Sequence, residues 1–201
     1  MNYFIIFILL FISKCFGQNI SEINKNLELS DSLKFEKEIR IYKDFSIING
    51  MEIFRMYDVG ENNWKATIYY YSKKTKNCTK IENIEFPKEK KGNLKVKNPY
   101  LIWLNILQCD VESLPNLKDV KYKLKKSSIV LEKDNYEIEK EKTKVCDGVV
   151  YEVYIRNHKI GNHFIYDNPE TYLDLYPNVD ELISFNNLLS IIKKEFNLWE
   201  D

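Results

Sequence analysis

Apolar and polar residues alternate over much of the first half of the chain, a pattern typical of antiparallel strands. In the segment 64–72, the even-numbered residues from Trp64 to Tyr70 would face one side, and Tyr69 and Tyr71 the other. The dipeptide Asn49-Gly50 is a strong turn signal between two such segments. The pattern predicts four strands, over residues 34–43, 51–58, 64–72 and 78–86.

The second half of the chain repeats this kind of pattern. Asp134-Asn135 and Asp147-Gly148 are turn signals between extended segments. We expect a second antiparallel meander with strands over residues 129–133, 136–144, 149–156 and 161–167.

Helical periodicity appears in three places. Asn98-Pro99 begins a segment, 100–111, that is apolar nearly all round and predicts a buried helix, and Asn168-Pro169 begins another helical turn. After Pro177, Asn178 and Glu181 have the spacing of a capping box. The helix that follows has its apolar stripe at Val179, Leu182, Ile183, Leu188, Leu189, Ile192 and Phe196.

These elements predict an α+β fold. We expect antiparallel β-meanders of about seven to eight strands with two to four helices, the longest at the C-terminus and packed on the sheet. A sheet with one apolar face needs such a cover, and the C-terminal helix has the longest regular apolar stripe.

The N-terminus has the features of a secretion signal. Residues 3–12 form an unbroken apolar run, about half as long as a membrane-spanning helix requires. Cys15 and Gly17 fit cleavage after Gly17, so we expect residues 1–17 to be a signal peptide and 18–201 to be a single exported domain, periplasmic or extracellular, with no stable membrane span. An uncleaved anchor and a lipoprotein acylated on Cys15 are the alternatives.

Composition narrows the classes of partner. The chain has 30 basic and 30 acidic side chains, so its overall charge does not favour nucleic acid. Cys78, Cys109 and Cys146 remain after cleavage, which permits at most one internal disulfide, and none of them belongs to a CxxC motif. We therefore expect neither a bound metal nor a cofactor.

Two sets of residues are candidates for a binding site. His158 and His163 flank a predicted hairpin tip, where they could share a metal or act as an acid/base pair with Glu152 or Asp167. Exposed histidines in a turn would explain the same pattern without function.

Trp64, Tyr69 and Tyr71 are the second candidate set, because they place large aromatic area on one strand. If one row is exposed, it would suit a protein or a sugar. If both faces of the sheet are covered, the same residues are core.

No catalytic motif is present: the chain lacks a Gly-x-Ser-x-Gly elbow and a glycine-rich phosphate loop. The sequence therefore favours a non-catalytic binding or interaction module, with another secreted or surface protein as partner. The alternative is a small, nuclease-like secreted hydrolase that uses His158 and His163.

Overall fold

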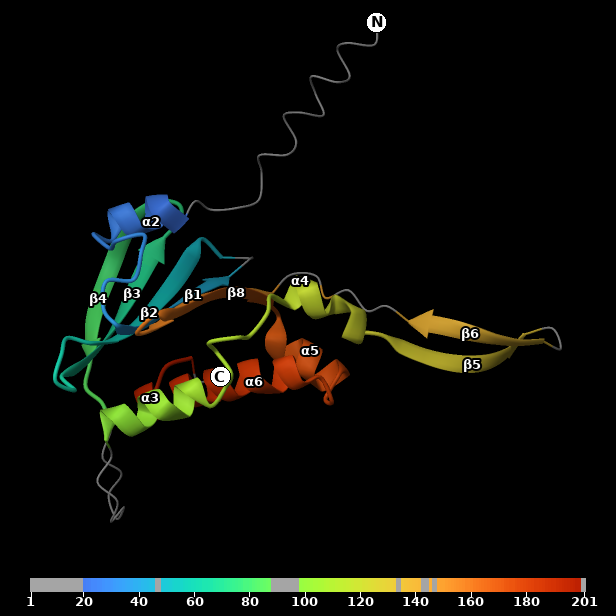
Figure 1. The fold of residues 1–201 in the computed structure, drawn as a ribbon. Coiled ribbons are helices and arrows are strands. Elements are labelled where there is room, and N and C mark those ends of the chain that lie inside the picture. Colours follow the sequence, from blue (N-terminus) through green and yellow to red (C-terminus); the bar gives the residue numbers. More distant parts are fainter. Residues whose placement is uncertain are drawn as a thin grey trace, which may run out of the picture.

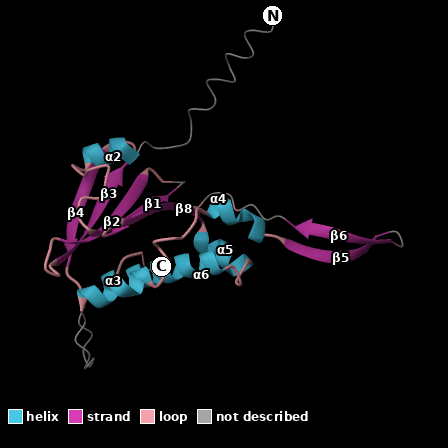
Figure 2. Ribbon diagram, in the orientation of Figure 1, coloured by secondary structure: helices cyan, strands magenta, loops and turns pink. Residues whose placement is uncertain are grey.

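The computed structural model describes residues 20–45, 48–87, 98–132, 135–141, 145 and 148–199. The predicted signal peptide, Cys15 and Cys146 lie outside the described residues. The described part has the predicted α+β fold, with eight strands, five α-helices and one 3-10 turn (Figures 1 and 2).

Six strands form one antiparallel sheet in the order β4-β3-β2-β1-β7-β8. The first four follow the predicted meander closely, and β3 has the predicted bounds. The strands are β1 (Lys37–Phe45), β2 (Gly50–Asp58), β3 (Trp64–Ser72), β4 (Asn77–Ile84), β7 (Val149–Asn157) and β8 (Ile160–Asp167).

The prediction of a second meander is wrong. Strand β7 pairs with β1, with Ile41 opposite Val153, so β7 and β8 complete the first sheet. The remaining strands, β5 (Lys126–Glu132) and β6 (Asn135–Glu141), pair only with each other among the described strands. They form a hairpin that projects from the body of the molecule, and we call it the arm (Figure 1).

Helices cover the inner face of the sheet, which carries the main core. This face includes Ile41, Phe54, Val153 and Phe164, which are fully buried. The helices are α3 (Pro99–Leu107), α4 (Leu117–Val120), the 3-10 turn η2 (Lys121–Lys123), α5 (Pro169–Leu175) and α6 (Asp180–Phe196).

Helix α6 packs on the sheet as predicted. Leu182, Leu189 and Phe196 are buried, and the Phe196 ring lies 4.7 Å from that of Phe54. Phe185 joins this stripe, while Ile183 is 37% exposed.

The start of α6 differs from the prediction. Val179 is its N-cap residue, and no side chain caps the helix there, so the capping box is not formed. The capping-box spacing was therefore misleading, and the helix depends on burial of its apolar stripe.

The outer face is covered by a segment that sequence patterns did not identify. Helix α2 (Ile20–Asn26) lies over part of this outer face. The segment that follows it, residues 27–36, lies there too, and we call this segment the strap. Ile23 and Leu27 pack in a second apolar cluster with Tyr42, Met51, Ile53, Tyr69 and Tyr71. Both faces of the sheet are thus buried where β1, β2 and β3 run.

Candidate functional site

The candidate aromatic residues of β3, Trp64, Tyr69 and Tyr71, are core residues. Trp64 packs beside Trp103 on the inner face, with ring centroids 5.4 Å apart. Tyr69 and Tyr71 belong to the outer cluster under α2 and are 8% and 4% exposed. This arrangement favours the interpretation in which both sheet faces are covered, because little of these rings reaches the surface.

His158 lies in the turn between β7 and β8, in the left-handed backbone region at φ 54°. Its backbone N–H donates to the Glu36 carbonyl at 2.6 Å, and its ring Nδ1 lies 3.2 Å from the Glu36 carboxylate. Both side chains are more than half exposed. The contact therefore ties the end of the strap to the turn in a solvated setting.

His163 makes a different set of contacts, on the outer face of β8. Its Nε2 lies 2.9 Å from Oε1 of Glu152, and the same oxygen accepts the Tyr154 hydroxyl at 2.6 Å. The His163 and Tyr154 rings stack with centroids 4.2 Å apart. Burial, followed by this bond to the Glu152 carboxylate, raises the pKa of Tyr154 above its ordinary value, so Tyr154 remains a hydrogen-bond donor at neutral pH.

The two histidines line the same shallow hollow of about 550 Å³ between the strap and β8. They contact different carboxylates, Glu36 and Glu152. Asp167 lies four residues beyond His163 along β8, roughly 13 Å away at the usual rise of a strand. The described residues contain no cluster of three or more metal-ligating side chains, which leaves the metal hypothesis without a ligand set.

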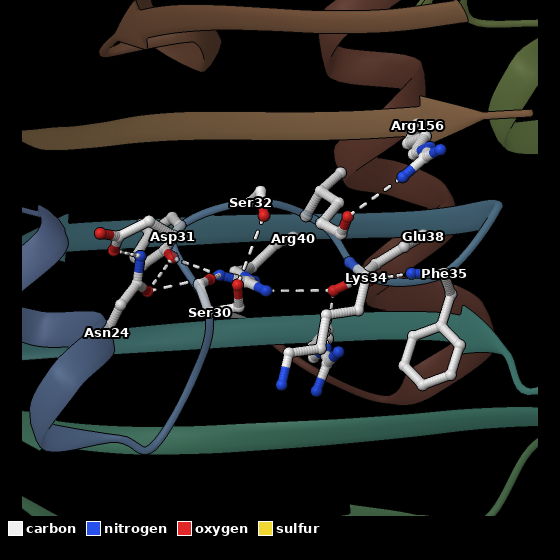
Figure 3. Close-up of polar contacts among 12 residues, drawn as sticks. Asn24, Ser30, Asp31, Ser32, Lys34, Phe35, Glu38, Arg40 and Arg156 are labelled. Atoms are coloured by element: carbon white, nitrogen blue, oxygen red, sulfur yellow. Dashed lines mark hydrogen bonds and ion pairs between the residues drawn. The ribbon is translucent and has the colours of Figure 1, made fainter. Parts of the chain in front are cut away.

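Charged residues are buried under the strap, at positions that sequence patterns had not singled out. Glu38 and Arg40 of β1 are 0% and 1% exposed, and Arg55 of β2 is 8% exposed. In Figure 3, Arg40 lies between Glu38 on one side and Ser30 and Asn24 on the other. In the sequence, charged Glu38 and Arg40 alternate with the isoleucines at 39 and 41. This alternation is the sequence pattern that indicates charged residues on the outer face of β1.

Glu38 is fully satisfied as an acceptor. Its Oε1 accepts from Arg40 at 3.1 Å and from Arg55 at 2.8 Å, and its Oε2 accepts the backbone N–H groups of Lys34 and Phe35. Burial opposes ionisation of this carboxyl, but the bonds from Arg55 and Phe35 outweigh it and hold the pKa of Glu38 below its ordinary value. The network fixes the strap on the sheet and leaves no carboxylate oxygen free for a ligand.

The arm presents the opposite arrangement, because its large apolar residues are exposed. Ile129 pairs across the hairpin with Ile138, and Leu131 pairs with Tyr136. Side chains two residues apart share a face, so all four lie on one side, which we call the apolar face. Their exposed fractions are 74% for Ile129, 62% for Leu131, 80% for Tyr136 and 68% for Ile138.

The other side of the arm is mostly polar, with Val130 as its apolar member opposite Glu137. Glu137 and Glu139 alternate with Tyr136 and Ile138 along β6 and therefore point away from the apolar face. Ser128 lies on this polar side, directly opposite Glu139. The arm thus has one mainly apolar and one mainly acidic side, and four of the exposed large hydrophobic side chains of the described residues gather on its apolar face.

Two cysteines fall within the described residues, and both are free. Cys109 is buried, and this burial raises its pKa to about 11, so it is an unreactive thiol at neutral pH. Neither cysteine takes part in a candidate site.

Comparison with family models, with curated proteins and with solved structures gave no significant match to this chain. Among the described helices, none is both long and apolar enough to cross a membrane.

Proposed function

We propose that this chain is an exported, non-catalytic interaction protein and that it binds another protein through the apolar face of the arm. The observation that carries the proposal is the exposure of four large apolar side chains, each more than 60%, on one side of a two-stranded hairpin. Together they expose on the order of 500 Å² of surface, in the range of the largest apolar patches on monomeric proteins, which are often functional.

The energetics of the arm support this role. Burial of one large apolar side chain stabilises a complex by roughly 1.5–3 kcal/mol before the costs of association are counted. A two-stranded hairpin without tertiary packing is only marginally stable in water. Contact with a partner would therefore both bury this surface and order the arm.

The shape and charge of the arm favour a protein as the partner. Small-molecule sites are concave, whereas the apolar face lies on an isolated pair of strands. Glu137 and Glu139 on the other side would repel phosphate groups, which disfavours nucleic acids and anionic lipid surfaces. A protein with an exposed apolar groove needs no concave site on the arm and carries no phosphate that the glutamates would repel.

The alternative function, a small secreted hydrolase, draws its support from the contact of His163 with Glu152. A carboxylate that orients a histidine is part of many acid/base sites. Here, however, the same Glu152 oxygen is shared with Tyr154, and His158 is engaged with Glu36. The geometry does not join the two histidines into one acid/base unit, so the interaction role is the better supported.

Site-specific photo-crosslinking tests the proposal. A benzophenone amino acid replaces Tyr136 on the apolar face, and matched controls carry it at Glu137 on the other side of the arm and at Lys159, an exposed residue of the β7-β8 turn. Crosslinking is carried out in the compartment or medium that receives the exported chain. There we expect discrete protein adducts from position 136 and few from the two control positions. Equal adduct yields at all three positions would contradict the proposal.

A further inference from the structure

We infer that the arm binds the arm of a second copy of this chain, apolar face against apolar face, in a two-fold dimer. The inference rests on the proposed function, since it names the partner of the same surface. It follows from the layout of side chains on the arm, from the charge of the chain and from the area that two arms would cover.

The layout of the apolar face is compatible with two-fold symmetry. It has three cross-strand rows: Ser127 with Lys140, Ile129 with Ile138, and Leu131 with Tyr136. When two arms pack in opposite directions about an axis through the middle row, the isoleucines of one copy meet those of the other. Isologous contacts of this kind require a self-complementary surface, and an uncharged aliphatic row provides one.

The outer rows complement each other in the same arrangement. The row that contains Lys140 of one copy lies over the row that contains Tyr136 of the other. A lysine ammonium over a tyrosine ring is a favourable cation–π contact. The opposite direction of the two arms also places the two protein bodies at opposite ends of the dimer.

The charge distribution selects the apolar face and permits self-association. Packing through the other side would bring Glu137 and Glu139 of one copy toward those of the other, and like charges at such distances repel. The chain as a whole has a formal net charge of zero, so no overall repulsion keeps two copies apart. Two arms would therefore pair through the apolar face and not through the acidic side.

The area buried between the two arms indicates a weak dimer. Two apolar faces would together bury on the order of 1,000 Å², at the lower end of specific protein interfaces. Interfaces of this size are typical of transient complexes, so we expect dissociation in the micromolar range or weaker. The dimer would be populated where the chain is concentrated and would dissociate on dilution.

Sedimentation equilibrium of the purified mature chain tests the inference. Over concentrations from about 1 μM to about 1 mM, the mass should rise from that of one chain toward that of two. Ile138→Lys should weaken this association at least about tenfold, because a charge would be forced into the apolar contact. Ser128→Lys is the matched control: it adds the same charge on the other side of the arm and should leave association unchanged.

The outcomes separate this inference from the proposed function. A chain that stays monomeric up to about 1 mM, or one that associates equally with Ile138→Lys and with Ser128→Lys, overturns the dimer. If the Tyr136 photo-adducts then contain a different chain, the interaction role stands with a different partner. If neither dimer nor adduct forms, both proposals fail.

Discussion

Beneath the strap, Glu38 and Arg40 are almost wholly buried, whereas on the arm Ile129 and Tyr136 are 74% and 80% exposed. The two regions thus invert the usual distribution of charged and apolar residues in a folded protein. Under the strap each carboxylate oxygen of Glu38 has two donors within the chain. On the arm the apolar side chains have no comparable packing within the described residues, since β5 and β6 form a sheet of their own.

The difference between these regions separates internal structure from interaction with other molecules. Buried charges that are satisfied inside the chain hold it together and need nothing from outside. Exposed apolar side chains gain free energy only when another surface covers them. The strap network is accordingly a structural site, and the arm is the region that we expect to act on other molecules.

Substitution at the buried pair should have the largest effect on stability. Glu38→Gln removes the negative charge but keeps the shape, so Arg40 and Arg55 lose the carboxylate that both of them contact. Breaking a buried ion pair in this way typically costs about 3–5 kcal/mol. Urea unfolding would measure the loss, with Glu36→Gln as control, since Glu36 is 77% exposed and its replacement should cost little. Equal losses in the free energy of unfolding for the two substitutions would show that the network under the strap stabilises the chain no more than an exposed contact does.

The same carboxylate should make stability depend on pH. The pKa of Glu38 is lower in the folded chain than in the unfolded one. Its contribution is therefore fully present above the unfolded pKa, at neutral pH, and is lost as the pH falls through the folded pKa. The difference in free energy of unfolding between the natural chain and Glu38→Gln should shrink on acidification. If this difference stayed constant down to strongly acidic pH, the conclusion that ionised Glu38 stabilises the fold would be wrong.

An intermediate effect is expected at the partly exposed pair that joins β7 and β8. The side chains of His163 and Glu152 are 45% and 22% exposed. Solvent screens such pairs, so His163→Ala should lower the free energy of unfolding by about 1 kcal/mol or less, including the lost stacking on Tyr154. Thermal unfolding is the measurement. A loss above roughly 2 kcal/mol would show that this cluster belongs with the buried network under the strap.

The smallest effect on stability should come from the arm. Ile129→Ser removes an exposed side chain, and exposed substitutions usually change stability by less than about 0.5 kcal/mol. Measured on dilute, monomeric protein, the melting temperature should hardly move, while association at high concentration weakens. A clear loss of stability in the monomer would mean that the apolar face packs within its own chain.

Strand β3 shows why local alternation was enough to predict much of the sheet. Its apolar residues at every second position meet buried neighbours on both sides, so the local pattern and the tertiary environment agree. The same alternation in Tyr136, Glu137, Ile138 and Glu139 contributed to the prediction of a strand over residues 136–144. No local signal distinguishes a strand that covers a core from one that leaves its apolar side to solvent. The arm was therefore predicted as two strands, but it was assigned to the wrong sheet.

The candidate sites were less accessible to prediction because they depend on distant residues. Glu38 and Arg40 lie two positions apart, but their neighbours come from α2, the strap and β2. Glu152 was recognised as a possible partner of His163, and the pairing of β7 with β8 brings the two together. Asn178 illustrates the reverse case: its local spacing to Glu181 matches a capping box, but Val179 is the N-cap residue, and the helix is fixed by burial of Leu182 and Phe185 in the core.

The separate pairing of β5 with β6 makes the arm a portable unit. It leaves the body after η2 and returns at β7, and none of the six strands of the main sheet pairs with it. Residues on its apolar face can therefore change without disturbing the registers of the main sheet, so the surface of the arm can diverge while the scaffold stays constant. The same property makes the arm suitable for grafting: a hairpin of other sequence in its place would present a different surface without redesign of the core.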